Sequence, residues 1–273
     1  MESIDFKNKN IAIIFNKGVK NPYPVLQQLE QELMNKGANP EVFEIKEMKY
    51  GFDFVFAVGG DGTILHVAKF YAMSKTPVLG INLGRLGFLS QISVDNLKSA
   101  IDNIFYNKFD IEKRMMLKAG DKIALNDFVV KGTSSTRTSR FVLKIDDKFV
   151  CDYIADGLIV STPTGSTAYG LSAGGPVLYP MLDAIAIVPI CPHTLTARPL
   201  VVPSYEKITI STCEEDIKNF SLVVDGAEIY EIENNVIIEK SKYKAHLALL
   251  TDEEFYSVLR DKLHWGVSPK RLW

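Results

Sequence analysis

The residues with the clearest chemical potential form a glycine-rich turn, Gly59-Gly60-Asp61-Gly62-Thr63. Its three glycines lack the Cβ atoms that would keep a phosphate group away from the backbone. A helical apolar pattern follows from Ile64, and the unpaired N–H groups at the start of a helix favour an anion. The turn therefore predicts a phosphate site formed by Gly59, Gly60, Gly62 and Thr63.

Asp61 is the unusual member of this turn, because a carboxylate beside a phosphate is electrostatically unfavourable. A metal ion between the two groups would remove the repulsion, or Asp61 could accept the proton of an attacking hydroxyl. The alternative is a tight strand-to-helix turn in which Asp61 caps the helix. The sequence contains neither the Walker A pattern Gly-Lys-Ser/Thr nor the dinucleotide pattern Gly-x-Gly-x-x-Gly, which disfavours an oxidoreductase that binds NAD in the usual manner.

A second segment, Asp156 to Gly175, is dense in hydroxyl side chains separated by small residues. It can offer hydroxyl and backbone hydrogen bonds to a polar ligand, with Tyr169 available to stack on a base. The alternative is a Gly/Ser/Thr-rich surface loop. Residues 170–174 also match the Gly-x-Ser-x-Gly nucleophile elbow of hydrolases. That elbow needs a strand running directly into Ser172, and the predicted strand ends near Ser161, so a hydrolase is disfavoured.

The elements that must position these residues fall into two regions. In the first hundred residues, strand patterns alternate with apolar residues at helical spacing. The strand patterns cover 11–15, 42–45, 54–58 and 77–81, and the helical patterns cover 25–37, 63–72 and about 94–106 after a cap at Ser93. Such alternation predicts an α/β domain with a Rossmann-like parallel sheet covered by helices.

After about residue 108 the chain consists of short segments rich in Val and Ile, separated by Gly, Asp, Asn and Pro. They cover 122–130, 140–145, 149–153, 158–160, 184–190, 207–211, 220–224, 229–238 and 245–250. This texture predicts a mostly β domain resembling a β-sandwich. One helical pattern, 253–263, closes the chain.

The composition excludes several classes of protein. A net charge of -2 over 273 residues gives no reason to expect nucleic-acid binding. No apolar run reaches the roughly 20 residues of a membrane span, and the N-terminus lacks the apolar core of a signal peptide. Cys151, Cys191 and Cys213 are few, odd in number and far apart, and none forms a Cys-x-x-Cys pair, so the sequence suggests neither a structural zinc site nor a disulfide framework. We therefore expect a soluble cytoplasmic protein.

Taken together, these segments resemble the bacterial NAD kinase family from about Ile11 to Trp265. The Gly-Gly-Asp-Gly-Thr turn alone is shared with diacylglycerol and sphingosine kinases and, more loosely, with phosphofructokinases. The narrower resemblance comes from the other blocks, which are residues 80–89, 125–127, 156–175, 189–200 and 224–226.

The resemblance implies transfer of the γ-phosphoryl group of ATP to the 2′-hydroxyl of the adenosine ribose of NAD, giving NADP. It also implies a divalent metal ion, with magnesium expected and its ligands unknown, and it assigns Asp61 as the general base. Asn126 and Asp127 match the pair that holds the adenine edge and the ribose hydroxyls, and Asp156 matches a residue at the nicotinamide end. The adenosine pocket would be lined by Thr167, Ala168, Tyr169, Gly170, Leu171 and Ser172.

Three further positions follow from the same resemblance. Gly62 would approach the dinucleotide phosphates, His66 would face the site one helical turn along, and Arg137 matches a basic position near the ligand phosphates. Ile154 departs from the family, because many members have arginine there, so the charge of that arginine is missing.

The resemblance also implies a homotetramer or dimer in which the β domain contributes to the NAD site of the neighbouring subunit. The expected domains are 1–107 with 253–273, where the C-terminal helix returns to the α/β domain, and 108–252, the NAD-binding and oligomerisation domain. NAD and ATP are the expected small-molecule partners. Two alternatives stay open: a lipid kinase of the same superfamily, and a sensor that binds a dinucleotide without transferring phosphate.

Overall fold

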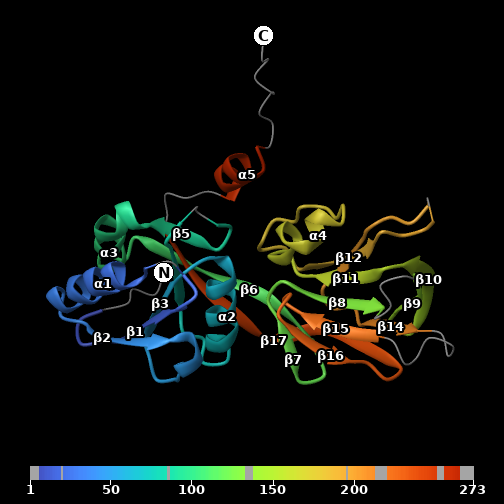
Figure 1. The fold of residues 1–273 in the computed structure, drawn as a ribbon, viewed down its shortest axis with the longest axis horizontal. Coiled ribbons are helices and arrows are strands. Elements are labelled where there is room, and N and C mark those ends of the chain that lie inside the picture. The colour runs from blue at the N-terminus through green and yellow to red at the C-terminus, as the bar shows by residue number, and fades with distance from the viewer. Residues whose placement is uncertain are drawn as a thin grey trace, which may run out of the picture. The chain divides into compact units, whose positions relative to one another are not determined.

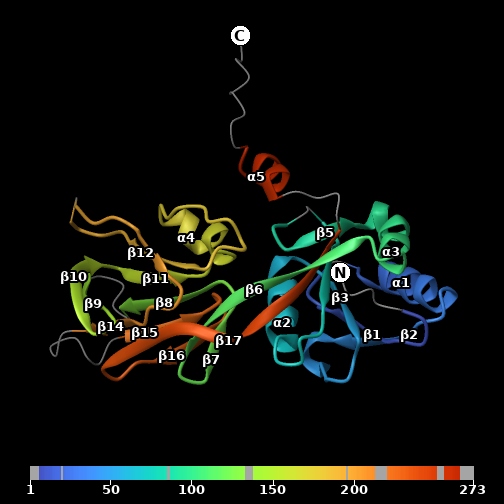
Figure 2. The ribbon, with the colours of Figure 1, turned by 180° about the vertical axis from the view of Figure 1, so that it is seen from behind.

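The computed structural model describes residues 6–19, 21–84, 87–132, 138–194, 196–212, 220–250 and 255–264. The chain divides into two compact units, residues 1–112 with 246–273 and residues 113–245; Figure 1 labels their elements. Strands β6 (Phe109–Ala119) and β17 (Asn235–Leu250) pair with each other and carry the chain from one unit into the other, as Figure 2 shows.

The first unit is built on a parallel sheet. Its strands are β1 (Asn10–Phe15), β2 (Asn39–Glu44), β3 (Phe54–Val58), β4 (Val78–Asn82) and β5 (Ser90–Ser93). They follow the order β2-β1-β3-β4, with β5 beside β4, and every one of these pairs is parallel. The end of β17 adds a further parallel pair, in which Leu247 lies opposite Val78. Strands β1, β3 and β4 are almost entirely buried, as the near-continuous apolar runs predict.

Helices cover this sheet on both faces. Helices α1 (Tyr23–Asn35) and α3 (Leu97–Phe105) share one apolar core with alternate residues of β1, β3 and β4. Helix α2 (Asp61–Tyr71) packs against β3 and β4, and its buried residues lie outside that core, so it covers the opposite face. Short 3-10 turns at Ile45–Glu47 and Val94–Asn96 complete the connections, and α5 (Phe255–Leu263) follows β17 along the chain.

The second unit contains two antiparallel arrangements of strands. A six-stranded sheet has the order β13-β12-β11-β8-β15-β16. The other arrangement has the order β10-β9-β14-β17, with β6 pairing β17 and β7 pairing β6. Their bounds are β7 (Lys122–Ala124), β8 (Asp127–Gly132), β9 (Ser139–Ile145), β10 (Lys148–Ala155), β11 (Gly157–Ser161), β12 (Ala184–Ile190), β13 (Leu200–Pro203), β14 (Ile208–Thr212), β15 (Phe220–Val224) and β16 (Glu228–Glu231).

Both arrangements bury one face in a shared apolar core, which makes this unit a sandwich. That core takes inward-facing residues from β6 to β17, with Phe128, Phe141 and Phe220 among its largest members. The six-stranded sheet is also covered on its other face, where Val129, Ile159 and Val188 pack with Leu178. The segment after β11 provides that cover, and it contains a 3-10 turn (Gly165–Thr167) and the short helix α4 (Tyr169–Ser172).

The structure confirms the expected fold class, an α/β region followed by a mostly β region with a C-terminal helix. Several element boundaries differ. Residues 122–130 form two strands, because the hydrogen-bonded pairing of strands is interrupted between β7 and β8. Residues 235–250 form one long strand, where two strands were expected. Ser93 precedes a 3-10 turn and makes no side-chain cap. Strands β5, β6 and β13 have no counterpart among the predicted segments.

Candidate functional site

Asp61 opens helix α2 and its carboxylate is held by the backbone of a separate segment. Gly60 is the N-cap residue of α2, and no side-chain cap bond is present there. The Asp61 carboxylate instead accepts the amide of Phe88 at 2.7 Å and that of Leu89 at 3.3 Å. The alternative in which Asp61 serves as a helix cap is therefore wrong. The oxygens of its carboxylate accept amides from a distant segment, at Phe88 and Leu89, and not from the first turn of α2.

This arrangement requires a glycine beside the carboxylate. A Cβ atom placed on Gly87 would overlap the carboxyl group of Asp61. Gly87 lies immediately before the two residues whose amides hold Asp61, so the backbone of 87–89 wraps closely around the carboxyl group. The orientation of Asp61 is thus fixed by main-chain atoms, which cannot rotate away as side chains can.

The glycines of the turn itself differ in what they are needed for. A Cβ on Gly59 would lie 2.6 Å from Oγ1 of Thr63, so packing within the protein explains this glycine. A Cβ on Gly60 or Gly62 would have no atom of the described residues within 4 Å. Neither Gly60 nor Gly62 has a positive φ, so neither backbone conformation nor packing demands a glycine there. Open space beside the first amides of a helix suits an approaching anion.

His66 lies one turn further along α2 and is exposed, whereas Thr63 is buried against Gly59. The structure thus places the predicted phosphate residues, Asp61 and His66 on one short stretch of the first unit. Phe88 and Leu89 also belong to this site through their amides. The sequence analysis includes both residues in the block 80–89 but predicts no role for them, because any residue type can donate a backbone amide.

Asn126 and Asp127 lie in the second unit, at the break between β7 and β8. The carbonyl of Asn126 accepts the amide of Thr162 at 2.9 Å, and the carbonyl of Leu125 accepts the Thr162 hydroxyl at 2.6 Å. A Cβ atom on Gly165 would overlap the Asn126 carbonyl group. The segment after β11 is therefore packed directly against Leu125 and Asn126.

The Asp127 side chain is buried, with 3% of its surface exposed. Burial, together with the smaller effect of the nearby negative charge of Asp225, raises the pKa of Asp127 to about 7. A carboxyl group with such a pKa exchanges a proton near neutral pH, which makes its charge sensitive to a ligand hydroxyl or cation placed beside it.

Because the pKa of Asp127 is raised in the folded state, its ionisation opposes folding. The stabilising effect of the buried neutral carboxyl is complete below the unfolded pKa of about 3.8 and is lost as pH rises through about 7. We expect Asp127→Asn to be more stable than wild type at pH 8, by up to a few kcal/mol at about 1.4 kcal/mol per pKa unit. Urea unfolding at pH 5 and pH 8 measures this, and an advantage of the variant that does not grow with pH would contradict it.

The remaining predicted NAD residues belong to the same unit. Asp156 follows β10 and is exposed, while its amide donates to the carbonyl of Ile190 at 3.0 Å. Tyr169 begins α4, is 38% exposed, and carries the Lys131 ammonium 5.1 Å from its ring centroid. The rest of the group, in and around α4, comprises Thr167, Ala168, Gly170, Leu171 and Ser172.

The hydrolase elbow at Ser172 does not form. Strand β11 ends at Ser161, and residues 162–168 with their 3-10 turn separate it from α4. This separating segment is tightly bonded, because the Ser166 hydroxyl donates to the carbonyl of Pro163 at 2.6 Å and accepts the amide of Leu178 at 3.0 Å. The segment is thus an ordered part of the protein and not a loose Gly/Ser/Thr loop.

Some residues fall outside these two clusters or were missed. Arg137 lies outside the residues that the structure describes. Arg114, which sequence reasoning did not select, is buried and donates from Nη1 to the Thr164 hydroxyl at 3.3 Å. Asp225, which lies in the predicted block 224–226, accepts the backbone amides of residues 125–127. Among the described residues, no group of three or more His, Cys, Asp or Glu side chains could hold a metal ion.

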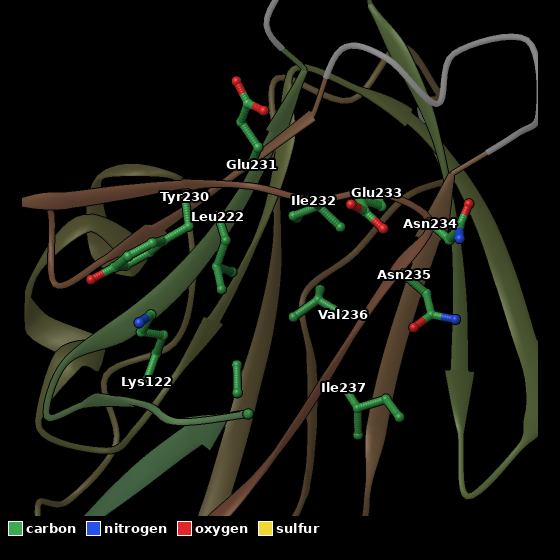
Figure 3. Close-up of a pocket in the computed structure, with 12 residues that line it drawn as sticks. Lys122, Leu222, Tyr230, Glu231, Ile232, Glu233, Asn234, Asn235, Val236 and Ile237 are labelled. Carbon is green, nitrogen blue, oxygen red and sulfur yellow. The ribbon is translucent and has the colours of Figure 1, made fainter.

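A separate pocket of about 540 Å³ lies in the second unit, and Figure 3 shows residues that line it. It lies at the turn after β6 and the loop between β16 and β17, where Lys122 stands over the ring of Tyr230 at 4.4 Å. Its lining residues are Ala119, Gly120, Lys122, Leu222, Tyr230, Glu231, Ile232, Glu233, Asn234, Asn235, Val236 and Ile237. They include none of the predicted site residues, so this pocket has no assigned part in the chemistry considered above.

Within the described residues, no helix combines the length and apolar character needed to cross a membrane.

Comparison with known proteins gives a consistent family. Residues 6–109 match the family described as the ATP-NAD kinase N-terminal domain, and residues 125–250 match the ATP-NAD kinase C-terminal domain. The NAD kinase of Clostridium botulinum (strain Kyoto / Type A2) is 41% identical over 273 residues, covering 94% of this chain and 97% of that protein. The NAD kinase of Caldanaerobacter subterraneus subsp. tengcongensis is 37% identical over 280 residues, covering 93% and 99%.

Solved structures agree with this relationship. An NAD kinase from Archaeoglobus fulgidus, crystallised in complex with ATP, superposes with a TM-score of 0.79 at 27% identity over 93% of this chain and 98% of that chain. A yeast NADH kinase complexed with NADH gives a TM-score of 0.84 at 23% identity, covering 98% and 91%. The second likeness concerns the fold alone.

Proposed function

The chain belongs to the NAD kinase family, and from this premise we propose that it transfers the γ-phosphoryl group of ATP to the 2′-hydroxyl of the adenosine ribose of NAD, forming NADP. The observation that carries the proposal is the Asp61 carboxylate, held by two backbone amides at the head of α2. Beside it lie Gly60 and Gly62, whose lack of side chains the surrounding protein does not require.

Asp61 acts in this proposal as the general base. An ionised carboxylate has roughly four lone-pair positions, and the amides of Phe88 and Leu89 take two of them. Asp61 would take the proton of the ribose hydroxyl as the oxygen–phosphorus bond forms and the bond to the bridging oxygen of ADP breaks. Fixed orientation by main-chain donors supports this role, since proton transfer depends on heavy-atom distance and alignment.

The phosphates are assigned to the turn formed by Gly59, Gly60, Gly62 and Thr63, with His66 and Arg137 as further residues near the ligand. The first amides of α2 would donate to phosphate oxygens and the missing Cβ atoms would allow close approach. A divalent ion, with magnesium expected, would supply charge neutralisation to the transferring group. Its protein ligands are not assigned, and an ion carried chiefly by the substrate phosphates needs few of them, since magnesium often uses only one or two protein carboxylates together with phosphates.

Besides Asp61, Gly62 and His66, the residues assigned to the dinucleotide lie in the second unit. Asn126 and Asp127 would hold the adenine edge and the ribose hydroxyls, and Asp156 would meet the nicotinamide end. The segment from Thr167 to Ser172 would line the adenosine pocket, with the partly exposed Tyr169 ring available for stacking on the base. The packing of Gly165 and Thr162 against Asn126 supports the assignment of both segments to one ligand.

Three broader features belong to the proposal. The active assembly would be a homotetramer or dimer in which a neighbouring subunit shares the NAD site, and the protein would act in the cytoplasm. Of the alternatives, a lipid kinase would share the glycine turn but not the family matches over 125–250. A dinucleotide sensor would keep NAD binding without phosphoryl transfer.

A coupled assay tests the proposed reaction. Purified protein is given NAD, ATP and magnesium, and NADP is read with an NADP-specific dehydrogenase. We expect turnover that depends on both substrates. If the folded protein binds NAD but forms no NADP with ATP or polyphosphate, the sensor alternative replaces the kinase; if it does not bind NAD, the substrate assignment is wrong.

A further inference from the structure

The carboxylate of Asp225 is surrounded by consecutive backbone amides from a distant part of the chain. It accepts the amides of Leu125 at 3.2 Å, Asn126 at 2.8 Å and Asp127 at 3.3 Å. The amide of Asp225 in turn donates to the carbonyl of Asp127 at 3.0 Å. Successive N–H groups that converge in this way form a concave anion site, which one side chain of the protein itself fills here.

The position of Asp225 follows from the sheet. Strand β15 ends at Val224, which lies opposite Phe128 in β8, so the next residue comes level with the start of β8. The turn that follows has φ of 49° at Asp225 and 69° at Gly226, and Asp is among the few residue types that accept the left-handed region. The turn thereby directs the carboxylate at residues 125–127 and away from its own strand.

The opposite side of the same segment is also held. Thr162 donates its amide to the Asn126 carbonyl and its hydroxyl to the Leu125 carbonyl, and Gly165 packs against Asn126. The N–H groups of residues 125–127 thus point to Asp225 and two of their carbonyls point to Thr162. Hydrogen bonds to Asp225 and Thr162 therefore satisfy the backbone groups of residues 125–127 at the break between β7 and β8.

We propose that Asp225 is a positioning residue for dinucleotide binding, which fixes the backbone of residues 125–127 so that the Asn126 and Asp127 side chains meet the adenosine part of NAD. This inference rests on the proposed function. Hydrogen bonds to a charged acceptor are stronger than those to a neutral one, so the carboxylate holds the three amides more firmly than a turn of uncharged residues would. The negative charge of Asp225 also contributes to the raised pKa of Asp127.

The test compares Asp225→Asn with Asp146→Asn. Asparagine also accepts the left-handed conformation, so the variant keeps the turn, but its amide group replaces one acceptor with a donor that faces backbone N–H groups. Asp146 is a matched control, because it lies in the β9–β10 turn with φ 46° and its Oδ1 accepts the Lys207 amide at 2.9 Å. Its partner lies outside residues 125–127.

We expect Asp225→Asn to raise both the KM for NAD and the calorimetric Kd for NAD about tenfold, with kcat and the KM for ATP changed far less. Asp146→Asn should leave all four quantities at wild-type values. Hydrogen exchange should show faster exchange of the amides of 125–127 in Asp225→Asn alone. This pattern separates positioning from a structural role, which would lower the unfolding temperature without a selective loss of NAD affinity.

Two outcomes would overturn the inference. One is unchanged NAD affinity in folded Asp225→Asn, and the other is an equal loss of affinity in both variants. Failure of the proposed function is distinguishable from both, because the wild-type protein itself would then form no NADP or bind no NAD. The exchange difference at residues 125–127 would persist in either case.

Discussion

Replacing Asp61 by asparagine is expected to lower kcat for NADP formation by about 10² to 10⁴, the contribution typical of a general base. Asparagine has nearly the same shape and can still accept one of the amides of Phe88 and Leu89, which hold the carboxylate at 2.7 and 3.3 Å. It cannot take a proton from the ribose hydroxyl. NAD binding, measured by calorimetry, should therefore change much less than turnover in the coupled assay.

Asp53→Asn is the matched control for this variant. Asp53 precedes β3 at the end of the strand opposite to the glycine turn, and its carboxylate also accepts a backbone amide, from Asn10 at 2.9 Å. Its loss should leave kcat unchanged. Turnover by Asp61→Asn within a few-fold of wild type would remove Asp61 from the role of base, even if the protein proved to be an NAD kinase.

Replacing Gly87 by alanine is expected to reduce kcat by about 10², although no catalytic group is altered. The new methyl group would overlap the Asp61 carboxyl group, so either that carboxyl or the 87–89 backbone must move. A displacement of roughly 1 Å at a reacting group can cost about this factor in rate. The measurement is kcat at saturating NAD and ATP, together with the unfolding temperature to establish that the variant folds.

Gly84→Ala provides the comparison, because it lies in the same connection and a Cβ there would be 3.7 Å from Oδ1 of Asn82, an ordinary contact. It should retain activity close to wild type. If Gly87→Ala keeps full turnover, the orientation of Asp61 seen in the structure is not the one used in the reaction.

Patterns in the sequence are enough to predict the class of fold and the family. Alternating strand and helix patterns in the first hundred residues indicate a covered parallel sheet because burial on both faces produces continuous apolar strands. The residue types of the glycine turn predict a phosphate site, and the turn together with the blocks at 125–127 and 156–175 resembles the NAD kinase family. Both conclusions agree with the structure and with the relatives.

How the candidate site residues are held becomes visible in the folded chain alone. Strand β6 escaped prediction because charged residues interrupt its apolar pattern, and β17 continues through a polar stretch because paired strands support it. The amides of Phe88 and Leu89 reach Asp61, and the carboxylate of Asp225 reaches residues 125–127, across long separations in sequence. The periodicity of apolar residues indicates which faces of an element are buried. These hydrogen bonds depend instead on backbone donors and on the register between strands, which the type of a single residue does not predict.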